Sequence, residues 1–284
     1  AAGPRRVSGR VGEPLPAGET AHVAGGFSGT SRRYDETVVP NAMGARRLVA
    51  SLPREDLPRA LDVGCGTGFA TTELVERRGT RSVIGVDPAA GMLDEFRAKM
   101  AAHPDVEIDL RQATFADMDV PPGSVDVAIS TMAFHWFDDR RAAAAAMVDA
   151  VRPGGLVAAL APARGADEEF FAAVERLDPP APPEWMAART RFIVDPEEMD
   201  AAFRATDVDL LDVWVEERRR RATPDAFLER MRTVATHVFL RTPGYPEEEL
   251  EDAWRRTEIE IRGMSGSRGF EWAFNKVYVV GRRR

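Results

Sequence analysis

Short apolar runs alternate with longer amphipathic stretches from about Tyr34 to Pro162. The apolar runs are nearly continuous, which is typical of strands that are covered on both faces of a parallel sheet. They predict strands over residues 59–64, 81–87, 106–113, 125–131 and 156–163. The stretches between them predict crossover helices over residues 70–79, 89–103 and 139–151. This alternation indicates an α/β fold.

The pattern becomes less regular after Pro162. Pro153 is expected to end the third crossover helix, with Gly154 and Gly155 turning the chain into the last of these strands. Four prolines then make residues 177–185 a stiff connector. Helices are predicted over residues 196–206, 224–240 and 246–262, and strand-like runs over 208–221 and 270–281. We interpret the two strand-like runs as the far edge of the same sheet and the helices between them as a cap.

Composition narrows the class of protein. The chain is 44% hydrophobic and 30% charged, which is typical of a globular protein. Its formal charge of −8 provides no general electrostatic reason to bind nucleic acid or an anionic membrane. A single cysteine, Cys65, excludes an intrachain disulfide and a thiolate zinc cluster, and the four histidines have no metal-binding spacing. No apolar run is long enough to span a membrane and no secretory signal is present, so we expect a cytoplasmic protein without a metal.

A glycine-rich turn follows the first predicted strand. Gly64, Gly66 and Gly68 stand at every second position, directly before a predicted helix. Such a turn presents backbone N–H groups and admits close contact with a nucleotide-like ligand. Asp62 precedes the first glycine and would repel the pyrophosphate of a dinucleotide, whereas it would attract the ammonium and sulfonium of S-adenosylmethionine. The spacing G-x-G-x-G also differs from the dinucleotide pattern G-x-G-x-x-G.

A second acid, Asp87, ends the second predicted strand. A carboxylate at this position can accept hydrogen bonds from both ribose hydroxyls of either ligand. Pro88 follows it, and Met92 would lie against the adenine one turn into the next helix. A P-loop is excluded because no lysine and Ser/Thr pair follows the glycines.

Three motifs, "LDVGCGTG", "VIGVDPAAGML" and "VRPGG", together resemble the class I S-adenosylmethionine-dependent methyltransferases. Within that family the chain is similar to the small-molecule group that includes ubiquinone-biosynthesis and trans-aconitate methyltransferases. "FSGTSRRYDETVVP" and "STMAFHWFDD" extend the resemblance, which covers residues 27–162 well and the remainder only in general plan. It implies a Rossmann-like, seven-stranded, mostly parallel sheet whose last strand is antiparallel, with helices on both faces and a helical cap inserted in the C-terminal half.

The resemblance also implies roles for individual residues. Asp62 would lie near the methionine ammonium, the glycines would line the methionine portion, and Asp87 would hold the ribose. Thr114 stands where the group usually has an adenine-binding Asp, which is a departure from the family pattern. The implied cofactor contacts are Asp62, Gly64, Cys65, Gly66, Gly68, Asp87, Pro88, Met92, Thr114, Phe115 and Thr131.

Catalytic residues are less clearly indicated, because methyl transfer from an activated sulfonium can proceed by positioning alone. His135 follows the fourth predicted strand and is the candidate base, with local hydrogen bonding as the alternative role. Tyr34, Phe134 and Trp136 are candidate acceptor contacts; plain packing is the alternative role of Tyr34, and core or pocket wall is the role that the sequence favours over chemistry for Phe134 and Trp136.

These observations predict an S-adenosylmethionine-dependent methyltransferase acting on an O, N or C nucleophile of a small molecule, with a preference for oxygen. A nicotinamide-dependent Rossmann oxidoreductase and a non-catalytic S-adenosylmethionine-binding protein stay open as alternatives. The expected partner is a small-molecule acceptor; no nucleic acid and no membrane are expected, and a homodimer stays open. The expected organisation is a flexible segment over residues 1–26 and a methyltransferase domain over 27–284, with lid helices over 27–55 and cap elements over 164–205 and 222–268.

Overall fold

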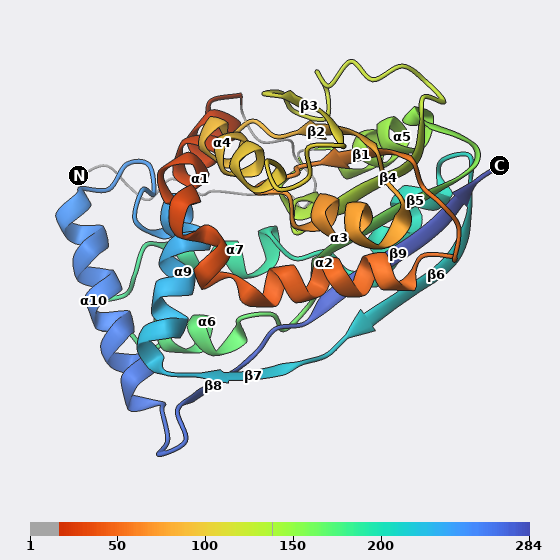
Figure 1. Cartoon of the computed structure of the whole chain (residues 1–284). Coiled ribbons are helices and arrows are strands. Elements are labelled where there is room, and N and C mark those ends of the chain that lie inside the picture. The colour runs from red at the N-terminus through yellow and green to blue at the C-terminus, as the bar shows by residue number, and fades with distance from the viewer. Residues whose placement is uncertain (1–16, 138) are drawn as a thin grey trace.

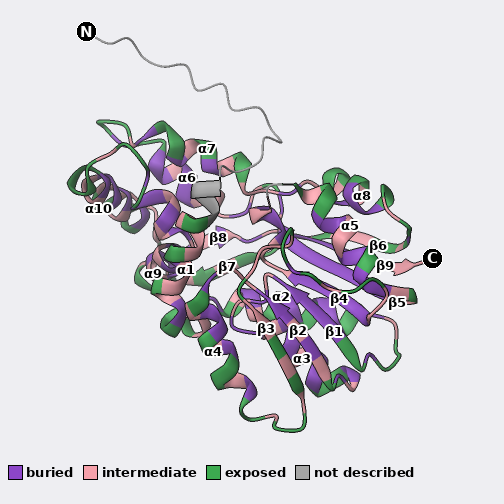
Figure 2. Ribbon diagram, turned by 90° about the horizontal axis from the view of Figure 1, so that it is seen from above, coloured by how far each residue is buried: buried purple, intermediate pink, exposed green. Residues whose placement is uncertain are grey.

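The structure, a computed structural model, describes residues 17–137 and 139–284 and consists of a central sheet between two layers of helices, with a helical cap at one end (Figures 1 and 2). The strands are β1 (Arg59–Val63), β2 (Ser82–Val86), β3 (Glu107–Arg111), β4 (Val125–Thr131), β5 (Val151–Pro162), β6 (Val208–Glu216), β7 (Arg219–Ala222), β8 (Phe270–Ala273) and β9 (Lys276–Arg283). The helices are α1 (Ala17–Thr37), α2 (Val39–Ser51), α3 (Phe69–Arg78), α4 (Ala90–Met100), α5 (Arg140–Ala150), α6 (Glu168–Val174), α7 (Pro183–Arg191), α8 (Pro196–Arg204), α9 (Pro224–Phe239) and α10 (Glu247–Gly263), with a short 3₁₀ turn η1 (Phe134–Trp136).

The central sheet has seven strands in the order β3-β2-β1-β4-β5-β9-β6. Strands β1 to β5 are parallel, and β9 runs antiparallel to both of its neighbours, β5 and β6. This confirms the predicted α/β sheet with an antiparallel last strand. Because the strand order reverses between β1 and β4, the carboxyl ends of these two strands border a crevice, which is where ligands bind in open α/β sheets.

Helices cover both faces of the sheet. Helices α2, α3 and α4 pack on one face and α5 and α8 on the other, and each group covers its own aliphatic core.

Local sequence explains where several of the helices begin. The Asp139 side chain accepts hydrogen bonds from the first turn of α5, and the Thr223 hydroxyl oxygen accepts one from the first turn of α9. Prolines occupy the first turns of α7, α8 and α9, where a missing N–H has no cost.

The cap is built on a two-stranded ribbon. Strands β6 and β9 continue past short breaks into β7 and β8, which pair with each other and not with the main sheet. Helices α9 and α10 connect β7 to β8, and together with α6 and α7 they enclose a separate, aromatic-rich core (Figure 1). Helix α1 lies along α9 and also contacts α4, so it bridges the cap and the sheet.

Several details differ from the sequence-based expectations. The runs over 208–221 and 270–281 were expected as unbroken edge strands of the main sheet, but each divides where the ribbon leaves that sheet. Strand β5 begins at Val151 instead of 156, because a bulge opposite β4 accommodates Pro153 inside the strand. Helices α6 and α7, and the strands β7 and β8, were not predicted as separate elements.

The expected segment boundaries can be compared with the same elements. Residues 17–26 of the segment expected to be flexible form the first half of α1, and residues 1–16 lie outside the described residues. Helix α8 falls within the expected cap range 164–205, yet it packs on β6 and α5. None of the helices in the described ranges has the length and apolar character needed to cross a membrane.

Candidate active site

A cavity of about 180 Å³ lies at the carboxyl ends of β1, β2 and β4 and extends beneath α1. Its floor is the turn after β1, where Gly64 and Gly66 have φ values of +68° and +53°, in the left-handed region that favours glycine. A Cβ atom on residue 64 would lie 2.2 Å from the Cβ of Ala133, so the close approach of these two loops requires glycine at this position. No atom lies within 4 Å of the corresponding position on Gly66, which faces open space.

The structure brings most of the predicted site residues to this cavity. The predicted residues that line it are Tyr34, Gly64, Cys65, Gly66, Asp87, Pro88, Met92, Thr114, Phe115, Thr131 and Trp136. Asp62, Gly68, Phe134 and His135 are not among its lining residues. Whether the lining residues contact a cofactor is not tested by this geometry, and their assigned roles stay predictions.

Asp87 is held by the turn itself. The backbone N–H of Gly66 donates to its Oδ2 at 2.9 Å, and that of Ala89 donates to its Oδ1 at 2.8 Å. Desolvation nevertheless raises the pKa of Asp87 to about 6, while these two backbone hydrogen bonds oppose the shift. Each carboxylate oxygen keeps a second lone pair, so the group can still accept hydrogen bonds from a diol at the cavity wall.

Asp62 lies behind the turn and has no exposed surface. Its Oδ2 accepts a hydrogen bond from the hydroxyl of Thr71 at 2.8 Å, whereas its Oδ1 has no hydrogen-bond partner among the described residues. Burial raises its pKa to about 7, against the opposing effect of the Thr71 hydrogen bonds. Burial makes the ionised form of this carboxyl group unfavourable, and one of its oxygens has no partner among the described residues. A cationic ligand group bound at the neighbouring glycine turn would offset that desolvation cost.

The N-terminal helix α1 closes the cavity from above. Asp35 accepts a hydrogen bond from the Thr67 hydroxyl at 2.5 Å and forms an ion pair with Lys99 at 2.6 Å, which ties α1 to the glycine turn and to α4. Phe27 and Tyr34 project from α1 into the lining, and Phe27 packs edge-on against Trp136 with ring centroids 5.7 Å apart. The position of Phe27 in the cavity wall was not predicted, because a single apolar residue in a helix has no distinguishing pattern in the sequence.

One wall of the cavity is formed by the loop around Thr114 and Phe115. The hydroxyl of Thr114 donates to Asp117 at 3.0 Å, and its oxygen accepts from the backbone N–H of Ala116 at 3.2 Å. Both hydrogen bonds of the Thr114 hydroxyl are therefore made within its own loop. Backbone groups of this wall are the other candidates for contact with a purine. Phe115 packs against Phe137 with ring centroids 5.3 Å apart, so this wall is largely aromatic.

Two candidates around η1, Phe134 and His135, are buried and do not line the cavity. Phe134 has no exposed surface and stacks on Phe203 in the core beneath the sheet. His135 is also buried, and burial, together with the charge of Arg140, holds its pKa well below the usual value. Its imidazole is therefore neutral and its Nδ1 lacks a partner among the residues that the structure describes. Both residues precede Trp136, which does line the cavity.

Two residues that were not predicted complete the wall beneath α1. Asn41 donates from Nδ2 to the Tyr34 hydroxyl at 3.2 Å, and its Oδ1 is buried without a partner among the described residues. Met132 follows β4 with a φ of +54°, an uncommon conformation for a side chain of this size. Backbone strain of this kind is frequent at ligand sites and is not readable from sequence.

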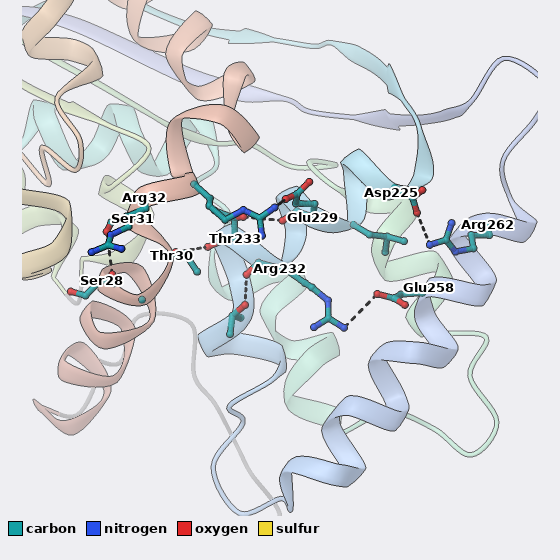
Figure 3. Close-up of a pocket in the computed structure, with 14 residues that line it drawn as sticks. Ser28, Thr30, Ser31, Arg32, Asp225, Glu229, Arg232, Thr233, Glu258 and Arg262 are labelled. Atoms are coloured by element: carbon teal, nitrogen blue, oxygen red, sulfur yellow. Dashed lines mark hydrogen bonds and ion pairs between the residues drawn. The ribbon is translucent and has the colours of Figure 1, made fainter. Parts of the chain in front are cut away.

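A larger groove of about 910 Å³ lies outside α1, between α9 and α10 (Figure 3). Most of its charged side chains are already paired across the groove, Arg33 with Glu229, Arg232 with Glu258, and Arg262 with Asp225, whereas Arg32 has no ion pair among the described residues. The hydroxyls of Thr30 and Thr233 donate to backbone carbonyls. The groove therefore presents few unpaired groups, and it lies away from the glycine turn. Among residues 17–137 and 139–284, no three His, Cys, Asp or Glu side chains are grouped to hold a metal ion.

Comparison with known proteins identifies the part of the chain around the turn. Residues 60–155 match the family described as "Methyltransferase domain". The chain is 35% identical over 118 residues to the trans-aconitate 2-methyltransferase of Rhodopseudomonas palustris, covering 42% of this chain and 44% of that protein. It is 33% identical over 159 residues to the malonyl-acyl carrier protein O-methyltransferase of Serratia marcescens, covering 55% and 58%. The matches thus span about half the length of these relatives.

Solved structures extend the likeness to the whole fold. The YcgJ protein from Bacillus subtilis superposes with a TM-score of 0.56 at 17% identity, covering 85% of this chain and 99% of that one. The cyclase SpnF superposes with a TM-score of 0.54 at 12% identity, covering 85% and 81%. At such identities the likeness shows a shared Rossmann-like fold, which these two differently named proteins both have. The family resemblance drawn from the three motifs is confirmed for residues 60–155.

Proposed function

From a chain that contains a class I methyltransferase domain, we propose an S-adenosylmethionine-dependent methyltransferase that acts on a small-molecule acceptor. The observation that carries this proposal is the cavity at the switch point between β1 and β4. The cavity is lined by a glycine turn with left-handed backbone and by Asp87, the acid at the position proposed for ribose binding. Asp62 is buried directly behind the turn.

The residues present fit this cofactor. The unpaired Oδ1 of Asp62 supplies negative charge next to the turn, where the amino-acid end of the cofactor would lie. The open space at Gly66 admits close contact, and Asp87 is oriented by two backbone donors toward a diol. When bound, S-adenosylmethionine would supply an activated methyl group, and S-adenosylhomocysteine would be the second product.

The chain contributes positioning and exclusion of water. Helix α1 covers the cavity, and the aromatic rings of Phe27, Trp136 and Tyr34 form an apolar wall on the acceptor side. Burial raises the pKa of Tyr34 to about 12, so its hydroxyl stays protonated and can donate a hydrogen bond to an acceptor oxygen. His135 does not line the cavity, and the geometry favours a reaction driven by alignment over one that depends on a base.

The acceptor nucleophile is proposed to be oxygen. This preference rests on the names of the two relatives, one an O-methyltransferase and the other a methyltransferase of trans-aconitate. We further propose that residues 164–195 and 219–273 form the cap over the acceptor, because these segments enclose the aromatic core next to Met132. A homodimer and a cytoplasmic location stay predictions, which light scattering and cell fractionation would test.

The direct test is transfer of a radiolabelled methyl group from S-adenosylmethionine to a panel of hydroxy and carboxylic acids, with the products identified by mass spectrometry. We expect a methylated product and equimolar S-adenosylhomocysteine. The Asp62→Asn variant is the matched control and should transfer more slowly at limiting cofactor. Saturable binding of NADH without binding of S-adenosylmethionine would instead indicate an oxidoreductase. Binding of S-adenosylmethionine without transfer to any acceptor would favour the non-catalytic alternative.

A further inference from the structure

Buried N–H donors without partners gather where the β7–β8 ribbon meets α9. The Nε of Arg220, the Nε of Arg230 and the Nε1 of Trp272 are all enclosed, and none has a hydrogen-bond partner in the part of the chain that the structure describes. Most buried donors in folded proteins are paired, so three unpaired ones in one region require an explanation. All three are donors, which indicates that the missing partner is an acceptor.

These donors are brought together by strand register. Arg220 on β7 lies directly opposite Trp272 on β8. Two residues after Trp272, the ring of Phe274 carries two cations: the guanidinium of Arg230 lies 4.3 Å from its centroid and the ammonium of Lys276 lies 4.8 Å from it. The strand register and the shared ring thus gather one tryptophan and three cations in one region, in which Trp272, Arg230 and Lys276 are buried and Arg220 is half-buried.

The positive charge in this region is balanced only in part, because Glu216, the cross-strand neighbour of Lys276, is itself ion-paired with Arg47 and Arg218. Lys276 is 1% exposed, its ammonium donates to the carbonyl of Pro40 at 2.5 Å, and no carboxylate of the described residues lies within 4.0 Å of it. Arg220 likewise has no carboxylate partner within the described ranges, and its Nη1 reaches only the sulfur of Met43 at 3.6 Å. Arg230 is paired with Asp167 through both terminal nitrogens. Burying an ammonium without an ion-paired carboxylate of its own is costly, so this arrangement favours an anionic ligand.

The cluster lies behind one end of the candidate active site. Pro40, which accepts from Lys276, is followed by Asn41, which lines the cavity and holds the Tyr34 hydroxyl. Met132 also lines the cavity and packs against the cap core that contains Trp272 and Phe274. This end of the cavity is therefore the one closest to the unpaired donors.

We infer that the methyl acceptor carries an anionic group, a carboxylate, which enters the Tyr34–Asn41 end of the cavity and is attracted there by the positive charge of Lys276, Arg220 and Arg230, which lie behind the lining residues at that end. The inference rests on the proposed function for the identity of the ligand as an acceptor. The cluster lies outside residues 60–155, so it belongs to the part of the chain that the family match does not cover. It would select among acceptors by charge, while the glycine turn selects the cofactor.

The test measures binding of succinate, as a small carboxylate probe, and of its neutral diamide by calorimetry, with and without S-adenosylhomocysteine. We expect succinate and not the diamide to bind wild-type protein. Lys276→Met and Arg220→Met should each weaken succinate binding about tenfold or more. Arg221→Met is the matched control, because this exposed neighbour on the same strand is already paired with Glu271, and its variant should bind within about twofold of wild type.

A second readout separates a ligand contact from a structural role. Desolvation lowers the pKa of Lys276 to about 7, with Arg220, Arg230 and Arg218 lowering it further and Glu216 opposing them. An anion bound beside Lys276 raises that pKa, so succinate binding near pH 7.5 should take up protons, which calorimetry in buffers of different ionisation enthalpy detects. The uptake should disappear in Lys276→Met, whose folding is checked by circular dichroism.

Three results would overturn the inference: no succinate binding to wild type, equal binding by all three variants, or an equal loss in Arg221→Met. Failure of the proposed function has a different signature, since S-adenosylhomocysteine would then not bind while succinate binding by the cluster persisted.

Discussion

The sheet and the cap are held together by different means. Each of the two cores that flank the sheet contains two buried aromatic residues among aliphatic ones, whereas the cap core contains nine, contributed by α6, α7, α9, α10 and the β7–β8 ribbon. The glycine turn is held by backbone hydrogen bonds to the neighbouring strand β2, whereas the cavity wall beneath α1 consists of side chains from α1, α2 and η1. Cofactor binding and cap packing should therefore respond separately to mutation, and the predictions below test that separation.

Breaking the cap core should have the largest effect on stability. Trp254 is fully buried against Phe170, Trp185 and Phe239, none of which lines the cavity. Trp254→Ala should lower the free energy of unfolding by about 3–5 kcal/mol, as measured by urea titration. Under conditions where the variant is folded, its affinity for S-adenosylmethionine should match that of wild type. An affinity loss would mean that the cap and the cofactor site are one cooperative unit. Trp254→Phe, which keeps an aromatic ring, should lose less stability.

The glycine turn after β1 should tolerate an added methyl group less well than the turn between α9 and α10, which contains Gly244, does. Gly64→Ala places a side chain in a left-handed conformation and 2.2 Å from Ala133, so we expect a loss of about 2–5 kcal/mol and weaker cofactor binding. Gly244→Ala is the matched control, because Gly244 has a φ of +88° with no atom within 4 Å. It should cost about 1–2 kcal/mol and leave the affinity unchanged. Equal effects would show that steric contact at the turn is unimportant.

Removing the charge behind the turn should affect binding more than folding. Asp62→Asn keeps an oxygen to accept from Thr71 and eliminates a buried carboxylate. S-adenosylmethionine should bind about 10- to 100-fold more weakly, with stability unchanged or increased at neutral pH. Calorimetry and urea unfolding measure the two effects. Unchanged affinity would remove the electrostatic reason for a cationic ligand.

The pH dependence should be the smallest effect and should follow from the same acid. Because the pKa of Asp62 is raised to about 7 in the folded protein, its stabilising contribution is present at low pH and is lost as pH rises from about 4 through 7. A cationic ligand favours the ionised form, so affinity should fall roughly fivefold from pH 7 to pH 6, with protons released on binding. Asp62→Asn should flatten this profile. A profile that survives the substitution would assign the titration to another group, such as Asp87.

The sequence predicted the sheet half in detail because its signals are local. Near-continuous apolar runs, glycines at positive φ and acids at strand ends specify β1, β2 and β4 and bring Gly64, Asp87 and Thr131 to one cavity. The cap could not be predicted in the same way. Its core depends on contacts between segments far apart in the chain, such as Phe227 with Trp272, and a break of two residues moves β7 and β8 out of the main sheet.

The site shows the same division. Residues that act through backbone or strand-end position were predictable, whereas Asn41 and Met132 depend on where helices α1 and α2 and the cap settle. Phe134 and Trp136 are two positions apart in one apolar segment, yet only Trp136 reaches the cavity, because η1 turns the two side chains in different directions. The proximity of the three unpaired donors of Arg220, Arg230 and Trp272 is likewise visible only once the strand register and the packing of α9 are known.

The most direct test of the account is calorimetric titration of the purified protein with S-adenosylmethionine, S-adenosylhomocysteine and NADH in turn. The account predicts saturable one-to-one binding of the first two ligands, weakened by Asp62→Asn, and no binding of NADH. Binding of NADH alone would contradict the interpretation of the glycine turn, and the proposed methyltransferase activity would have to be abandoned with it.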